Sequence, residues 1–362
     1  MMKTGDKMKR LEKVKWSAVF TALLAAALYG ISSPASKILL EEVPPAFLAA
    51  LLYLGAGAGM LLLRLARRIE HKKGKEAGIA RQDIPYVLGM ILLDIAAPIL
   101  LMLGLYYSDP VNVSLLNNFE IVATTMIALV VFKEAVGKRL WLAIVMITAA
   151  CIVLTLEDVR QLTLTPGSVF VLLACVCWGF ENNCTRMLSI KDPNQIVIMK
   201  GFGSGLGAFG IASFTGQLGG TLLFVLLTML LGFVSYGLSI YFYIKAQRIL
   251  GASRTSAYYA AAPFMGVIVS WMIFREEITH RFILALGFML AGAWLAATEL
   301  HTHKHVHEAV THDHMHSHSD GHHNHMHEPE MLEEHSHVHT HAAVTHDHFH
   351  TPDLHHAHTH KN

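Results

Sequence analysis

The histidines of the last part of the chain are the residues with the most evident chemistry. Of the 25 histidines, only His71 and His280 precede residue 300, and the segment Thr311–His327 reads THDHMHSHSDGHHNHMH. Neutral imidazole is a good ligand for Zn, Ni, Cu and Co, and histidine-rich tracts are a recognised metal-binding composition. Alternation also places histidines on one side of an extended chain, so that neighbours can share an ion. We therefore expect several labile tail sites for Zn, Ni, Co or Cu and no required cofactor.

The tail is itself a duplication. The run that begins at His301 recurs from His335, and Ala309–His316 recurs as Ala343–His350. The expected metal ligands are His301, His303, His305, His307, His312, His314, His316, His318, His322, His323, His325, His327, His335, His337, His339, His341, His346, His348 and His350. With no periodic apolar pattern, residues 300–362 are expected to be disordered without a ligand. Two other interpretations stay open, namely that the tail senses pH or that it only stores metal.

Polar residues inside long apolar runs form the second chemical group. A charged side chain at the centre of a membrane span costs about 2.5–3.5 kcal/mol on insertion scales and usually marks a transport pathway. The alternative is a carboxyl group that pairs with a neighbouring helix for packing, and asparagine is also common between packed helices. The expected pathway residues are Asp94, Asn117, Glu120, Glu181 and Asn182.

The charge of these residues indicates the kind of solute. A carboxylate in a low-dielectric environment takes up a proton more readily than one in water, which suits exchange of protons for a cationic or amine-bearing solute. Asn117 and Glu120 are three residues apart and share a helix face. Lys200 lies nearer the end of its apolar run, so its side chain is expected to extend to the membrane surface.

Residues 1–300 consist mainly of long apolar runs that must position these groups. Runs of about 18 or more apolar residues are long enough to cross a bilayer, and lipid-facing backbone favours helices. Ten spans are expected, at 16–38, 44–64, 84–107, 111–132, 139–157, 167–187, 194–215, 219–244, 254–274 and 281–299. All four cysteines fall inside these spans, so a disulfide framework is not expected.

Lysine and arginine set the expected orientation. They concentrate in residues 1–15 and 64–81 and at the other junctions on the same side, which places both termini in the cytoplasm of a multi-pass protein of the cell membrane. The bilayer and a small-molecule or metal-ion substrate are then the expected partners, with a proton gradient for energy. No nucleic-acid partner is expected. The oligomeric state stays open, a homodimer included.

The two halves of this region repeat each other. Tyr29-Gly30 with Lys37 corresponds to Trp178-Gly179 with Arg186, and VVFKEAVGKRLWL corresponds to WMIFREEITHRFIL 142 residues later, where Phe132-Lys133-Glu134 aligns with Phe274-Arg275-Glu276. Five spans per half give the halves opposite orientations, and inverted repeats of this kind support alternating access. We expect a basic N-terminus at 1–15, five-helix repeats at 16–157 and 158–299, and the tail at 300–362.

The segments LYGISSPASKILL, LLNNFEIVATTMIALVVFKE and YYAAAPFMGVIVSWMIFREE carry a resemblance to a known family. Residues 16–299 resemble the EamA-type members of the drug/metabolite transporter superfamily. The resemblance implies an all-α membrane fold of ten helices in two inverted repeats, a central solute pathway and secondary transport, often export. Where the family usually carries an apolar or proline-containing stretch, this chain has Asn117-Asn118-Phe119-Glu120, whereas the second half has Ala262 beside Pro263.

Three functions remain open from the sequence. The first is an exporter of a divalent transition metal such as Zn, Ni or Co, which the tail also binds. The second is an exporter of an amino acid or another small metabolite, with the tail as a metal or pH regulator. The third is a membrane-tethered metal store. No catalytic residues are expected, since the tail histidines lack a partner nucleophile and no glycine-rich phosphate loop is present, so the protein is not expected to be an enzyme.

Overall fold

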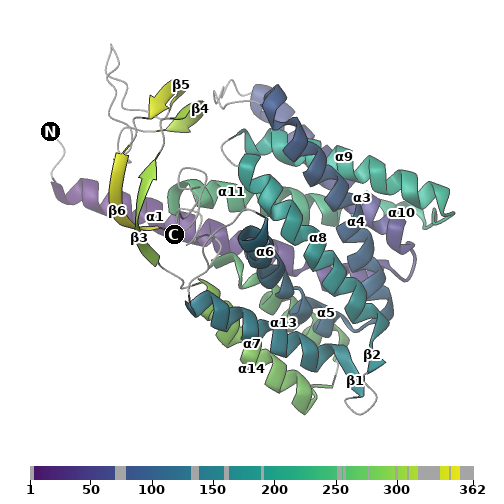
Figure 1. Ribbon diagram of the computed structural model, residues 1–362. Coiled ribbons are helices and arrows are strands. Elements are labelled where there is room, and N and C mark those ends of the chain that lie inside the picture. Colours follow the sequence, from purple (N-terminus) through teal and green to yellow (C-terminus); the bar gives the residue numbers. More distant parts are fainter. Residues whose placement is uncertain are drawn as a thin grey trace.

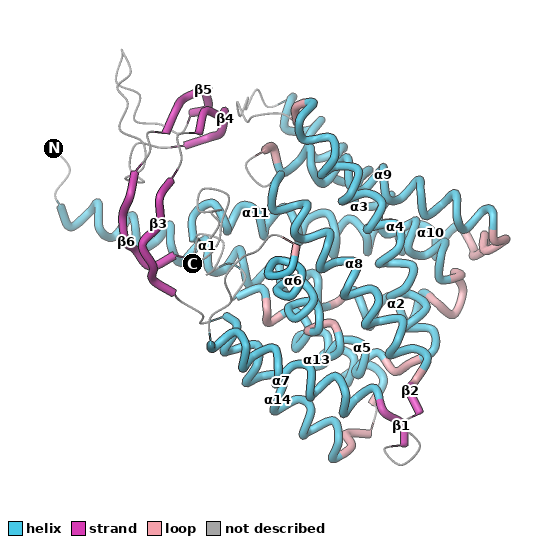
Figure 2. Tube along the Cα trace, viewed as in Figure 1, coloured by secondary structure: helices cyan, strands magenta, loops and turns pink. Residues whose placement is uncertain are grey.

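The structure is a computed structural model in which helices form the body, one short strand pair lies within it, and four longer strands occur in the tail (Figures 1 and 2). It describes residues 4–69, 79–131, 138–158, 163–188, 191–250, 255, 258–275, 277–297, 301–307, 310–316, 335–341 and 344–350. In the first half lie α1 (Thr4–Gly30), α2 (Ser32–Leu39), α3 (Pro45–Ile69), η1 (Arg81–Asp83), α4 (Ile84–Tyr107), α5 (Pro110–Leu116), α6 (Phe119–Val130) and α7 (Lys138–Thr155). After a short antiparallel pair, β1 (Leu156–Asp158) with β2 (Thr163–Leu164), follow α8 (Pro166–Leu188), α9 (Pro193–Phe214), α10 (Leu222–Gly232), η2 (Phe233–Leu238), α11 (Ser239–Leu250), α13 (Ala262–Phe274) and α14 (His280–Ala297).

The body has the composition of a multi-pass membrane protein. Among the described residues, seven helical stretches are long and apolar enough to cross a membrane: Trp16–Leu39, Pro45–Ala66, Ile84–Tyr107, Pro110–Val130, Pro166–Thr185, Pro193–Phe214 and Leu222–Ala246. The helices at the other three expected spans, α7, α13 and α14, are shorter. At about 1.5 Å per residue, the 13 residues of α13 span about 20 Å. The helix starts late in its span because the chain turns at Ala260 and Ala261.

Several spans are interrupted near their middle. α1 gives way to α2 at Ile31, and α5 gives way to α6 at Asn117 and Asn118. The stretch Leu222–Ala246 changes to a π-helix in η2 before it continues as α11. Interrupted helices leave backbone polar groups at membrane depth, which is tolerated where protein or a pathway surrounds them and is common in secondary transporters.

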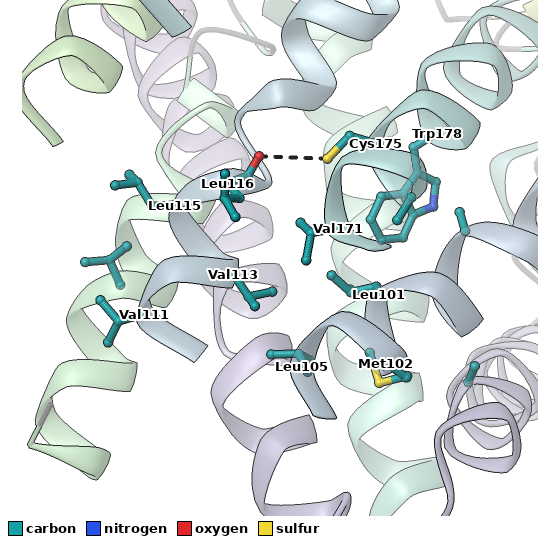
Figure 3. Packing of buried hydrophobic residues seen from close by; sticks show 14 of the residues in the cluster. Leu101, Met102, Leu105, Val111, Val113, Leu115, Leu116, Val171, Cys175 and Trp178 are labelled. Carbon is teal, nitrogen blue, oxygen red and sulfur yellow. Dashed lines mark hydrogen bonds between the residues drawn. The ribbon is translucent and has the colours of Figure 1, made fainter. Parts of the chain in front are cut away.

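The interruption between α5 and α6 is held against α8. Figure 3 shows Val113, Leu115 and Leu116 of α5 beside Val171 and Cys175 of α8, all of them buried. The Cys175 thiol donates to the carbonyl oxygen of Leu116 at 3.9 Å and lies 3.8 Å from that of Asn117. The apolar contacts fix the half-helices, and the thiol gives the Leu116 carbonyl at the interruption a hydrogen-bond partner.

The glycines of the two repeated aromatic–glycine pairs, Tyr29-Gly30 and Trp178-Gly179, make matching contacts. A Cβ on Gly30 of α1 would lie 2.7 Å from the carbonyl oxygen of Ala262 at the start of α13. A Cβ on Gly179 of α8 would lie 2.9 Å from the carbonyl carbon of Ala123 in α6. Each glycine therefore lets the first helix of its half approach a helix of the other half. The second repeated motif is Phe132-Lys133-Glu134, which aligns with Phe274-Arg275-Glu276. Residues 132–137 and Glu276 of this motif and its surroundings lie outside the described residues.

Glycines also bring α3 and α10 into backbone contact. A Cβ on Gly232 would lie 2.0 Å from the carbonyl oxygen of Leu52, a distance that no relaxed side chain can adopt. We expect Gly232→Ala to separate these helices and to lower the free energy of unfolding by about 1–3 kcal/mol, the usual cost of overpacking. Thermal unfolding in detergent measures this. Gly287→Ala is the matched control, since a Cβ there meets nothing within 4 Å. Equal loss in both variants would contradict this account of the packing.

Four tail segments form strands, which differs from the expected disorder. β3 (His301–His307) pairs antiparallel with β6 (Val344–His350), and β4 (Val310–His316) pairs antiparallel with β5 (His335–His341). The alternation of histidine with residues such as threonine and valine has the period of two that a strand requires, and those residues favour strands. The remaining expected ligands lie outside the described residues: His318, His322, His323, His325 and His327.

Candidate functional site

A buried charge cluster joins three helices of the body. The Nζ atom of Lys200 in α9 lies 3.0 Å from Oδ2 of Asp94 in α4 and 2.9 Å from Oε1 of Glu181 in α8. The exposed fractions are 7% for Lys200, 0% for Asp94 and 2% for Glu181. The expectation that Lys200 extends to the membrane surface was therefore wrong. Its single positive charge lies between two carboxylates that would otherwise be buried without a counter-ion, and it offsets part of their negative charge.

Hydrogen bonds complete the cluster. The Tyr53 hydroxyl of α3 donates to Oδ1 of Asp94 at 3.0 Å, and the Thr185 hydroxyl donates to Oε1 of Glu181. The close approach that buries Lys200 has a local cause in the next residue, because a Cβ on Gly201 would lie 2.4 Å from the backbone nitrogen of Gly57 in α3. α9 therefore packs on α3 closely enough for the Lys200 side chain to stay inside the helix bundle.

A second polar group surrounds Glu120, in the first turn of α6. The Asn182 side chain in α8 donates to Oε1 of Glu120 at 2.7 Å and to the Thr124 hydroxyl at 3.3 Å. The next residue, Asn183, donates to the carbonyl oxygens of Gly179 and Thr124 at 2.8 and 3.3 Å. Glu120 is half-buried, whereas Asp94 and Glu181 are fully buried. A carboxylate is also favoured in the first turn of a helix, where backbone N–H groups point toward it.

Asn117, the third residue expected near the fourth-span polar group, lies at the interruption between α5 and α6. It ends α5, and its side chain is buried with its amide oxygen unpaired among the described residues. A backbone hydrogen bond connects the two residues, in which the Glu120 N–H donates to the Asn117 carbonyl oxygen at 3.1 Å. The structure therefore brings Glu120 and Asn182 into contact, and it brings Asp94 and Glu181 onto Lys200, while the Asn117 side chain contacts neither group by a hydrogen bond in the described part.

A series of tyrosines from both halves leads away from Asp94, starting at Tyr53, and was not predicted from the sequence. The ring of Tyr236 in η2 lies 5.3 Å from that of Tyr53 and 5.8 Å from that of Tyr29 in α1. Tyr259 continues the series, with its ring centroid 5.9 Å from that of Tyr29 and 4.9 Å from that of Tyr243 in α11. Ser32 donates to the Tyr236 hydroxyl at 3.3 Å. The one signal in the sequence is that these polar-tipped rings stand in otherwise aliphatic spans.

The chain matches the model of a protein family described as the EamA-like transporter family, over residues 16–156 and again over 165–298. The protein belongs to the EamA-like transporter family. This membership confirms the resemblance found in the sequence, and members of the EamA-like transporter family are membrane transporters and not enzymes. The double match also accords with a body built from two related parts.

Two individual proteins resemble this EamA-like transporter. An uncharacterised transporter of Methanothermobacter thermautotrophicus is 27% identical over 308 residues, which cover 80% of this chain and 88% of that one. A solved crystal structure, described only as that of a protein, covers 78% of this chain and 96% of its own, with a TM-score of 0.54 and 16% identity. At that identity, the likeness concerns the fold alone.

The polar groups at the centre of this EamA-like transporter suit an ammonium group better than a metal ion. Glu120 is a carboxylate whose charge no ion pair offsets among the described contacts, and its hydrogen-bond partner is the neutral amide of Asn182. Among the described residues of the helical body, no group of three or more His, Cys, Asp or Glu could hold a metal ion. A hollow of about 450 Å³ lies elsewhere, between α3 and α10, and its lining by residues such as Leu62, Met229 and Phe233 is too apolar to bind a polar solute.

Proposed function

We propose that the body is a ten-helix secondary transporter with two inverted five-helix repeats, at residues 16–157 and 158–299. The double family match and the matching contacts of Gly30 and Gly179 support this arrangement. In it, α7, α13 and α14 are the three shorter membrane-crossing elements. The positive charge of the N-terminus and of the 64–81 loop supports cytoplasmic termini in the cell membrane. Inverted repeats can open a central site to either side, which is the basis of alternating access.

The solute in this proposal is small and carries an amino group, as an amino acid or a simple amine does. The observation that carries the proposal is the contact between Glu120 and Asn182 at 2.7 Å, at the interruption of the fourth span. Glu120 is the half-buried carboxylate of the centre. The body also holds a row of rings, in which Tyr29 lies 5.8 Å from Tyr236 and 5.9 Å from Tyr259 between centroids. A carboxylate binds an ammonium ion by charge-assisted hydrogen bonds, and aromatic faces attract cations.

Proton exchange belongs to the same proposal. Glu120 binds either a proton or the solute's ammonium group, so that loading of one displaces the other. The chain has no nucleotide-binding motif, and a proton gradient is the energy source that this competition would use. Export is the proposed direction, with inward-moving protons exchanged for outward-moving solute.

A divalent metal ion is less well supported as the solute. Asp94 and Glu181 already have the Lys200 ammonium between them, so they do not form an open set of anionic ligands. The positive charge of Lys200 also repels a divalent cation. This Coulomb repulsion is stronger inside a membrane protein than in water, because the dielectric constant is lower there. A tail that only stores metal would leave the polar centre of the body without a role.

A transport panel in vesicles tests the solute class. Purified protein in liposomes is given a proton gradient, and uptake of radiolabelled alanine, phenylalanine, lysine and tyramine is compared with that of their fully N-acetylated derivatives and of radioactive zinc. We expect at least one free amine to accumulate and its acetylated derivative to be excluded, because acetylation removes the positive charge. Zinc uptake without amine uptake, or equal uptake of both forms of every solute, would overturn the proposal.

A further inference from the structure

The paired strands of the tail set histidine opposite histidine. In the β3–β6 pair the partners are His301 with His350, His303 with His348, and His305 with His346. In the β4–β5 pair they are His312 with His339, His314 with His337, and His316 with His335. Since alternate residues of a strand lie on one face, the three pairs of each ladder share a face.

The opposite face of each ladder carries a different set of residues. In the β3–β6 pair, Thr302 is opposite Phe349, Lys304 is opposite Asp347, and Val306 is opposite Thr345. Thr311 is opposite Thr340 in the β4–β5 pair. A slip of one residue in either ladder would set every histidine against one of these other residues, because side chains alternate between faces. The register therefore separates a histidine face from a face of threonine, valine, aromatic and charged residues.

The duplication explains why there are two such ladders. The first copy supplies β3 and β4, and the second copy supplies β5 and β6 as their counterparts. Each strand pairs with the non-equivalent strand of the other copy, β3 with β6 and β4 with β5. The same combination of sequences therefore occurs twice, and each ladder takes one strand from each copy.

We propose that each ladder is a site for one transition-metal ion, such as Zn²⁺ or Co²⁺, bound by four histidines from two successive pairs. Directly opposite residues have Cβ atoms about 4.5–5.5 Å apart, and successive residues on one face are about 7 Å apart. That spacing suits four imidazoles around one ion at about 2.1 Å, the ligand number of tetrahedral zinc. The four register positions are His303, His305, His346 and His348 in one ladder. In the other ladder they are His312, His314, His337 and His339.

Metal binding and strand pairing support each other in this arrangement. A two-stranded sheet is marginally stable in water by itself, and the binding free energy of a metal that holds both strands contributes directly to folding. The inference rests on the backbone register of the tail alone and is independent of which solute the body transports.

The test is a Co²⁺ and Zn²⁺ titration of the purified full-length protein in detergent. Bound Co²⁺ is followed by the visible absorption that reports tetrahedral geometry, and Zn²⁺ is used to displace it. The key variant exchanges neighbouring residues, His303→Lys with Lys304→His, and so keeps the composition but moves one histidine to the other face of β3. The matched control is His325→Met with Met326→His, which exchanges neighbours outside the described ladders.

We expect the unmodified protein and the control to bind about two tetrahedral ions per chain, one per ladder. The exchange at 303 and 304 is expected to lose about half of the tetrahedral Co²⁺ absorption, because only the β4–β5 ladder stays complete. Equal absorption in the exchange variant and the control would overturn the proposal, since histidines would then bind without regard to register. Octahedral Co²⁺ alone, or no tight binding, would overturn it as well.

Discussion

Lys200→Met is expected to destabilise the body more than any other single substitution described above. The change leaves Asp94 and Glu181 buried without the ammonium group that lies 3.0 and 2.9 Å from them. Removing one partner of a buried ion pair typically costs about 3–5 kcal/mol, because the other charge stays buried and uncompensated. Thermal unfolding and the yield of monodisperse protein in detergent measure the effect.

A charge-free version of the cluster separates electrostatics from packing. The triple variant Lys200→Met, Asp94→Asn and Glu181→Gln keeps the side-chain volumes and removes all three charges. We expect it to recover most of the stability lost in Lys200→Met, since well-packed neutral groups often replace a buried ion pair at little cost. Lys245→Met is the matched control, because Lys245 is exposed. If Lys200→Met proved as stable as Lys245→Met, the ion pairs would not hold α4, α8 and α9 together.

Glu120→Gln is expected to abolish proton-driven transport while it leaves the fold intact. The glutamine oxygen can still accept the hydrogen bond that Asn182 donates at 2.7 Å, so the local packing is kept. The variant cannot carry a proton or a negative charge. Loss of a charge-assisted interaction of about 1.5–3 kcal/mol corresponds to a roughly ten- to hundredfold loss of uptake.

The measurement is the initial rate of amine uptake into vesicles under a proton gradient. Glu42→Gln serves as the control because Glu42 is an exposed carboxylate just after α2. Asn182→Ala should give a smaller loss, since it removes the hydrogen bond to Glu120 and leaves the carboxylate. Uptake by Glu120→Gln at the rate of Glu42→Gln would exclude Glu120 from the pathway.

The positions of the helices could be predicted from the sequence, because long apolar runs in a membrane protein have few alternatives to helices. The intramembrane carboxylates were also found, since each interrupts an apolar run. Their partners were harder to find, because the contact of Asp94 with Lys200 joins residues more than a hundred positions apart. The interruption before Glu120 was not predicted, although Asn117 and Asn118 are poor helix formers and mark it.

Lys200 shows why the sequence argument failed at one position. Its place near the end of a span favoured an extended side chain that reaches the membrane surface. Gly201 follows it directly, and a Cβ there would lie 2.4 Å from the backbone nitrogen of Gly57, so α9 packs closely on α3. A helix that packs so closely keeps a preceding lysine inside the bundle. A glycine-rich segment next to a lysine is therefore a signal for a buried cation.

In the tail, the extended conformation of the chain could be predicted from the sequence, but the pairing of its strands could not. Alternation of histidine predicted an extended chain with histidines on one side, as the strands have it. The ladders join residues of the two copies, such as His301 and His350, and no local pattern specifies which copy pairs with which. Long-range pairing of this kind is not encoded in any local pattern, and in our proposal a bound ion that joins both strands favours it.

The most direct test of the central claim is a simultaneous measurement of amine and proton movement in the same vesicles. Protein is reconstituted with a pH-sensitive dye inside, a transported amine is added outside without a pre-set gradient, and both fluxes are recorded. In the wild-type protein, amine entry is expected to be accompanied by proton exit, and both fluxes are expected to be lost together in Glu120→Gln. Amine entry with no change in internal pH, or proton exit that persists in Glu120→Gln, would contradict the claim.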